Sequence, residues 1–166
     1  VIPVTNAEVN LRKDPGMSAQ HVVSEETTDN VHALTVGVRW SDFDMYGHMM
    51  NANFIELAQE ARLAFAMHNF YSRGVNMVAF VRHIEADYVR PLKWDGRHGT
   101  VTVETTVVRL GKTSFTTRQK VKDSQGNVTC VIDCVQVTMD PETQMPREVT
   151  EEERAIILEH AVVELD

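Results

Sequence analysis

The pattern of hydrophobic and polar positions becomes regular near residue 31. Residues 1–30 are polar and show no sustained period, so we interpret them as an N-terminal arm. Over residues 32–40, by contrast, apolar side chains occupy alternate positions at Leu34, Val36, Val38 and Trp40. Such alternation is typical of a β-strand with one buried face. With 166 residues in all, we expect a single folded domain over residues 31–166.

One long helix is predicted over residues 53–72, where Phe54, Leu57, Ala61 and Phe65 fall at helical spacings. Other apolar side chains widen this face, namely Ile55, Leu63, Ala66 and Met67. A helix that is apolar around so much of its circumference should be buried on most sides.

The rest of the chain is predicted to be mainly strands, over residues 77–90, 99–110, 112–121 and 128–139. Short turns separate them, and Thr150 with Glu153 forms a capping-box pattern that opens a short C-terminal helix. Successive strands with short turns indicate an antiparallel sheet. A curved antiparallel sheet of about five to six strands around one long central helix is an α+β architecture.

Composition narrows the class of protein. The formal net charge of −8, without a basic run, disfavours nucleic-acid binding. Cys130 and Cys134 lie in one predicted strand about 13 Å apart, too far to form a disulfide, which favours a reduced compartment and a cytoplasmic location. No stretch is long and apolar enough to span a membrane, and the N-terminal residues lack a signal-peptide pattern.

Candidate chemistry is concentrated between the first predicted strand and the helix, at Asp42, Asp44, Gly47, His48 and Asn51. The N–H groups at a helix N-terminus lack partners and carry partial positive charge, so they can stabilise an oxyanion. A carboxylate beside them can act as a general base or as a nucleophile. An ordinary loop before a helix has the same residue types, so the local pattern alone leaves both interpretations open.

A family resemblance favours the catalytic interpretation. The run RWSDFDMYGHMMNANFIELAQEAR, residues 39–62, resembles the signature of the 4-hydroxybenzoyl-CoA thioesterase-like branch of hotdog-fold proteins. That signature reads Asp-x-Asp-x-x-Gly-His-Val-Asn-Asn, followed by an aromatic residue and a helix ending in Glu-Ala-Arg. VRHIEADYVRPLKWDG and GKTSFTTRQKV are also similar to family segments, and the resemblance extends over about residues 31–160.

The resemblance implies a hotdog fold and an acyl-CoA thioesterase. Asp44 takes the place of the catalytic nucleophile or general base, the backbone N–H of Asn51 that of the oxyanion donor, and Gly47 and His48 shape the site. Family members form homodimers or homotetramers with sites at the dimer interface. The chain departs from the signature at Met50, which replaces the first Asn of the pair. If that Asn contributes a hydrogen bond to the loop or the substrate, Met50 cannot make it.

The residues expected to contact substrate are of several kinds. Methionines would line a flexible acyl pocket, and arginine or lysine would hold the CoA phosphates. We assign substrate binding to Met49, Met50, Glu60, Arg90, Lys112 and Ser114.

No metal site is expected, because the histidines are scattered in sequence without ligand spacing. No cofactor is expected beyond coenzyme A as part of the substrate. Two alternatives stay open: a non-catalytic acyl-CoA-binding oligomer, which Met50 favours, and a hotdog hydratase or dehydratase.

Overall fold

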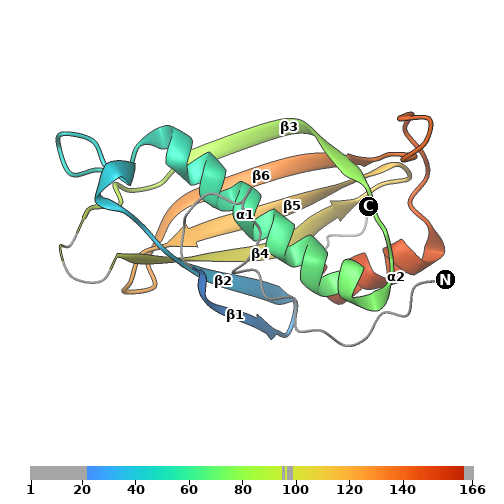
Figure 1. Ribbon diagram of the computed structural model, residues 1–166, viewed down its shortest axis with the longest axis horizontal. Coiled ribbons are helices and arrows are strands. Elements are labelled where there is room, and N and C mark those ends of the chain that lie inside the picture. The colour runs from blue at the N-terminus through green and yellow to red at the C-terminus, as the bar shows by residue number, and fades with distance from the viewer. Residues whose placement is uncertain (1–21, 95, 97–98, 163–166) are drawn as a thin grey trace.

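The computed structural model describes residues 22–94, 96 and 99–162, which fold into one antiparallel sheet and two α-helices (Figure 1). The strands are β1 (Val22–Thr28), β2 (Val31–Gly37), β3 (Ala79–Tyr88), β4 (Thr100–Leu110), β5 (Ser114–Lys122) and β6 (Val128–Thr138). They lie in the order β1-β2-β4-β5-β6-β3. The long helix α1 (Asn51–Asn69) crosses one face of the curved sheet. The predicted α+β class and hotdog fold are thereby confirmed.

The sheet begins at Val22, within the segment that we interpret as an arm from the sequence. Strand β1 pairs with β2 along its length, with Thr28 opposite Val31 and Glu25 opposite Leu34. Its sequence, VVSEETT, is mostly polar because β1 is an edge strand with most side chains exposed. Strands of this kind lack the alternation that marks a half-buried strand. The remainder of the expected arm, residues 1–21, lies outside the described residues.

Helix α1 buries one face against the sheet. Phe54, Leu57, Ala61 and Phe65, the residues that predict the helix, are each at most 3% exposed. Leu63 points away and is 43% exposed. Burial on most sides, as expected from the sequence, is therefore not reached within one chain, because the sheet covers only one side of the helix.

Two hydrophobic clusters fill the space between α1 and the sheet. The first lies under the N-terminal half of the helix and joins Phe54 and Leu57 to Leu34 on β2 and Ile132 on β6. The second surrounds Phe65 near the other end and includes side chains from β4, β5 and the C-terminal helix α2 (Glu151–Glu159). The first cluster supports the helix end that faces the candidate catalytic loop.

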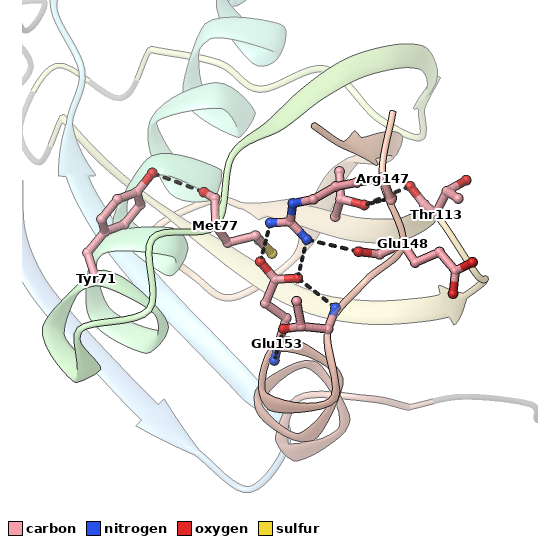
Figure 2. Close-up of polar contacts among 8 residues, drawn as sticks. Tyr71, Met77, Thr113, Arg147, Glu148 and Glu153 are labelled. Carbon is pink, nitrogen blue, oxygen red and sulfur yellow. Dashed lines mark hydrogen bonds and ion pairs between the residues drawn. The ribbon is translucent and has the colours of Figure 1, made fainter. Parts of the chain in front are cut away.

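Helix α2 is fixed by the predicted capping box and by a buried ion pair between Arg147 and Glu153, which Figure 2 shows. Thr150 accepts a hydrogen bond from the Glu153 N–H, and the Glu153 carboxylate accepts one from the Thr150 N–H. Arg147 also donates two hydrogen bonds to Glu153, at 2.8 and 2.6 Å. Since Glu153 is only 2% exposed, its charge depends on these partners.

Two further expectations concern the cysteines and membrane spans. Cys130 and Cys134 are both buried on β6 and are both free thiols, as predicted. Within the described part of the chain, no helix has the length and hydropathy needed to cross a membrane.

Candidate active site

Asp42 stabilises the loop between β2 and α1 through hydrogen bonds made by its buried side chain and its carbonyl. This side chain is 1% exposed, lies in the short 3-10 helix η2 (Trp40–Asp42), and accepts hydrogen bonds from the backbone and guanidinium of Arg39. The Asp42 carbonyl also accepts the N–H of Met50, the residue that precedes α1. Asp42 thus fixes where the helix begins, and its carboxylate is occupied by structural bonds.

Asp44 lies two residues further on and is exposed. One carboxylate oxygen, Oδ1, accepts hydrogen bonds from the backbone N–H groups of Tyr46 and His48, at 2.8 and 3.0 Å. The other oxygen, Oδ2, has no hydrogen-bond partner among the described residues. The loop therefore orients this carboxylate and leaves one oxygen available to a ligand.

The turn at Gly47 requires glycine. Its φ of +72° lies in the left-handed region, which other residues rarely adopt. The Gly47 carbonyl accepts the N–H of Trp94, and the Met49 N–H donates to the Leu92 carbonyl. These bonds attach the loop to the segment that follows β3.

The first helical residue of α1 is Asn51, so its N–H has no acceptor within the helix. Met50 is the N-cap, and its side chain makes no capping hydrogen bond. The first turn also contains no acidic residue that would neutralise the positive end of the helix dipole. The N-terminus of a nineteen-residue helix is thus open to a ligand's negative charge.

A cavity of about 490 Å³ brings these groups together. Of the residues predicted from the sequence, it is lined by Asp44, His48, Met49, Met50, Asn51 and Arg90. Gly47 does not line it but sets the path of the loop. The oriented Asp44 carboxylate and the N-terminus of α1 therefore line the same cavity.

Two aromatic side chains of this cavity are not among the predicted site residues. Tyr88 lies at the end of β3 and packs edge-on against Phe54, with ring centroids 5.6 Å apart. The Tyr88 hydroxyl donates to the Asn51 carbonyl at 3.4 Å, and burial raises its pKa, so the group stays protonated. The available sequence signal was a Tyr three residues before Pro91, and this pattern fits an ordinary strand residue equally well.

Three predicted residues are not brought to this cavity. Glu60 lies further along α1 and does not line it. Ser114 begins β5, and Lys112 lies in the β4–β5 turn, where it pairs with Glu148 at 2.8 Å. In one chain this turn is at the opposite end of the sheet from the Asp44 loop, as Figure 1 shows.

Lys93, unlike these three residues, lies next to the cavity that contains Asp44. It forms a β-bridge with His48 and lines a neighbouring cavity of about 360 Å³ with Phe43 and Trp94. The two cavities share Pro91 and Leu92. Arg90 thus lines the cavity that contains Asp44, and Lys93 lines the cavity next to it. Among the described residues, the one cluster of three side chains able to hold a metal ion lies elsewhere, near the C-terminal end of α1.

Comparison with known families agrees with this geometry. Residues 38–161 match the model of the thioesterase-like superfamily, which spans the loop, the cavity and both helices. The chain belongs to this superfamily. The resemblance noted in the sequence is confirmed.

Solved structures of the same fold include several thioesterases. A predicted thioesterase from Bacillus stearothermophilus is 23% identical over 79% of this chain and 96% of its own, with a TM-score of 0.67. A Thermus thermophilus thioesterase complexed with coenzyme A and Zn is 26% identical over 75% and 95%, with a TM-score of 0.63. A 1,4-dihydroxy-2-naphthoyl-CoA thioesterase from Synechocystis is 14% identical over 77% and 96%, with a TM-score of 0.61. No curated protein matches the sequence.

Proposed function

We propose that this member of the superfamily hydrolyses acyl-CoA thioesters to a carboxylic acid and CoA. The main observation behind this proposal is that the Asp44 carboxylate and the uncapped N-terminus of α1 line the same cavity. Hydrolysis needs a base or nucleophile and a donor for the negative charge that develops on the carbonyl oxygen. The thioesterases of the same fold, one of them bound to coenzyme A, support this choice of substrate.

In the proposed reaction, Asp44 removes a proton from water as the water oxygen attacks the thioester carbon. The backbone N–H of Asn51 donates to the resulting oxyanion. When the carbon–sulfur bond breaks, the CoA thiolate leaves and takes up a proton. Asp44 can alternatively attack the carbon itself and form an anhydride, which water then hydrolyses.

The two roles of Asp44 differ in where the new oxygen comes from. A single turnover in ¹⁸O-labelled water gives labelled acid if Asp44 is a general base. If Asp44 is the nucleophile and water attacks the Asp44 carbon of the anhydride, the acid released in that turnover carries no label and the label enters Asp44. Label in the Asp44 peptide, detected by mass spectrometry, therefore identifies the nucleophilic route through this attack.

The basic residues beside the cavity are proposed to hold the CoA phosphates. Arg90 lines the cavity that contains Asp44 and Lys93 lines the neighbouring cavity, and cationic side chains are natural phosphate partners. An Arg90→Ala variant should raise KM for acyl-CoA with a smaller change in kcat. Lys120→Ala is the control, because Lys120 is an exposed lysine on β5 that does not line either cavity.

We further propose that the active unit is a homodimer joined at β3. This strand ends the sheet order, and it exposes Phe80 by 52% and Tyr88 by 47%. Because Tyr88 also lines the cavity, a second chain along β3 would cover its open side.

Dimerisation would also explain how Lys112 and Ser114, which lie far from Asp44 within one chain, could reach the substrate. Antiparallel pairing of two β3 strands puts the Ala79 end of one beside the Tyr88 end of the other. The β4–β5 turn lies at the Ala79 end, because Ala79 pairs with Thr138 and Val137 with Ser114. The partner subunit's Lys112 and Ser114 would thus lie at the same end of the assembly as Asp44.

The dimer has its own test. Phe80→Asp should dissociate it in sedimentation experiments and reduce activity, since a charge would be buried at the interface. Val23→Asp is the matched control, because Val23 is similarly exposed, at 54%, on the opposite edge strand β1. An active monomer would contradict the shared site.

Hydrolysis is tested by the release of free thiol from a panel of short-chain, long-chain and aryl acyl-CoA substrates. Turnover above the uncatalysed rate with at least one of them is expected. Tight CoA binding with no turnover on any substrate would instead support a non-catalytic binding protein. Conversion of an enoyl-CoA to a hydroxyacyl product would support a hydratase.

A further inference from the structure

A second group of polar side chains lies near the C-terminal end of α1, away from Asp44. Glu25 on β1, His32 on the paired strand β2 and His68 on α1 meet there. Glu25 Oε1 lies 2.7 Å from His32 Nε2 and 3.5 Å from His68 Nδ1. The two imidazole rings are also in contact, with centroids 5.4 Å apart. Three elements thus direct ligand-type atoms to one place.

The spacing suits a metal ion. One nitrogen or oxygen atom from each of the three side chains lies within 4.8 Å of the other two. Zinc is bound by His nitrogen and carboxylate oxygen at about 2.0–2.2 Å, so its tetrahedral ligands lie roughly 3.3–3.5 Å apart. Both separations measured from Glu25 are within about 1 Å of that value. The third separation, between the two histidine nitrogens, is no more than 4.8 Å, and His68 is the most exposed of the three side chains, at 51%.

We propose that Glu25, His32 and His68 form a binding site for a divalent transition-metal ion of the Zn²⁺ class. Two imidazoles and one carboxylate are a known three-ligand zinc set that leaves a fourth position for water. The site lies outside the proposed active site and does not depend on it.

Burial and charge support this assignment. The His32 side chain is 0% exposed, that of Glu25 24% and that of His68 51%, so the site has a fixed inner side and an open outer side. Among the described residues, the ion-pair partners of Glu25 are these two histidines, with no lysine or arginine. A divalent cation would neutralise the carboxylate when both histidines are neutral.

The surroundings indicate how strongly the ion is held. Phe65 packs edge-on against His32 with centroids 5.8 Å apart, which fixes the ring by packing. The His32 Nδ1 is buried without a hydrogen-bond partner among the described residues. A metal on Nε2 leaves the proton on Nδ1, so the outer hydrogen bond that strengthens many metal–histidine sites is lacking. We expect reversible binding that is weaker than at a four-ligand structural site.

Metal binding would connect an edge strand to the helix. Among the strands that the structure describes, β1 lies at one edge of the sheet and pairs with β2 alone. A metal held by Glu25 and His68 would attach it directly to α1. Bound metal should therefore slow local opening of residues 22–28 more than that of an interior strand such as β5.

The direct test is titration of the metal-free full-length protein with Zn²⁺ in competition with a chromogenic chelator. Glu25→Gln and His68→Ala should each weaken binding by about tenfold or more. The matched controls are Glu26→Gln on the same strand and His83→Ala on β3, both at exposed positions outside the cluster. Neither control should change the affinity.

Hydrogen exchange gives an independent readout. Zn²⁺ should slow exchange in residues 22–28 of the wild-type protein and should not do so in Glu25→Gln. The proposal is overturned if Glu25→Gln and His68→Ala bind Zn²⁺ as tightly as the wild type. It is also overturned if the metal leaves exchange in β1 unchanged.

Discussion

Asp44 and His48 are joined by two reciprocal hydrogen bonds. The Asp44 N–H donates to the His48 carbonyl at 2.8 Å, and the His48 N–H donates to Asp44 Oδ1 at 3.0 Å. The five-residue loop is thus closed on itself, with one carboxylate oxygen used for structure and the other left for chemistry. The position of the proposed catalytic group therefore depends on the backbone path through Gly47.

Replacement of Gly47 should reduce activity because it changes the backbone conformation that positions the Asp44 carboxylate. Gly47→Ala meets no atom within 4 Å, so its cost arises from the φ of +72° alone. That cost is about 1–2 kcal/mol in a rigid loop, and relaxation of the backbone would move the His48 N–H away from Asp44. We expect a clear drop in kcat for thiol release, measured beside the free energy of unfolding.

The matched control for this variant is Gly74→Ala. Gly74 has a similar φ of +78°, also has open space around a Cβ, and follows the 3-10 helix η3 (Tyr71–Arg73) after α1. It should cost similar stability without loss of activity. Equal loss of activity in both variants would mean that Gly47 acts through stability alone.

Met50→Asn should stabilise the protein. Met50 is the N-cap of α1 and its side chain accepts no capping hydrogen bond, whereas Asn is among the preferred N-cap residues. The gain should be about 1 kcal/mol in the free energy of unfolding, measured by urea denaturation. Because Met50 also lines the cavity, the preferred acyl chain should change as well. An unchanged or lower stability would contradict this account of the helix terminus.

Much of the fold could be predicted because its signals are local. The alternation of Leu34 and Val36 marks β2, and both side chains are buried as that pattern requires. Thr150 and Glu153 mark the start of α2 and make both capping-box bonds. In each case the deciding interaction lies within a few residues of the pattern, so no knowledge of the tertiary structure was needed.

The features that the sequence did not reveal depend on distant segments. Tyr88 joins the cavity only because the end of β3 lies beside the start of α1. His32 and His68 are 36 positions apart and share Glu25 only after α1 packs on the sheet. Strand β1 has too few buried side chains to show a period. Asp44 was the favoured catalytic residue through family resemblance, whereas its hydrogen bonds became visible only in the structure.

Acid should weaken the attachment of α2. Burial raises the pKa of Glu153, but the hydrogen bonds from Arg147 and Thr150 outweigh it and bring the pKa below the usual 4.5. A carboxyl group with a lowered folded-state pKa stabilises the fold above its unfolded pKa, and this stabilisation is lost as the pH falls through the folded value. Glu153→Gln should therefore cost about 3 kcal/mol at pH 7 and progressively less below about pH 4.5.

Glu159→Gln is the control for this prediction. Glu159 also accepts two hydrogen bonds from one arginine, Arg73, but the two side chains are 49% and 44% exposed. An exposed pair contributes roughly 0.2–1 kcal/mol, so the change should be small at pH 7. Urea denaturation of both variants at several pH values measures the difference. A cost for Glu153→Gln that did not decrease in acid would contradict the ion pair.

The central claim is that the free oxygen of Asp44 takes part in thioester hydrolysis, and the most direct measurement is kcat of Asp44→Asn on the best acyl-CoA substrate. Asn keeps an Oδ1 that can accept from Tyr46 and His48, so the loop, the melting temperature and CoA affinity should be preserved. We predict that kcat falls by about 10²–10⁴-fold, the usual contribution of a positioned base. A folded Asp44→Asn variant with kcat within a few-fold of the wild type would contradict the account.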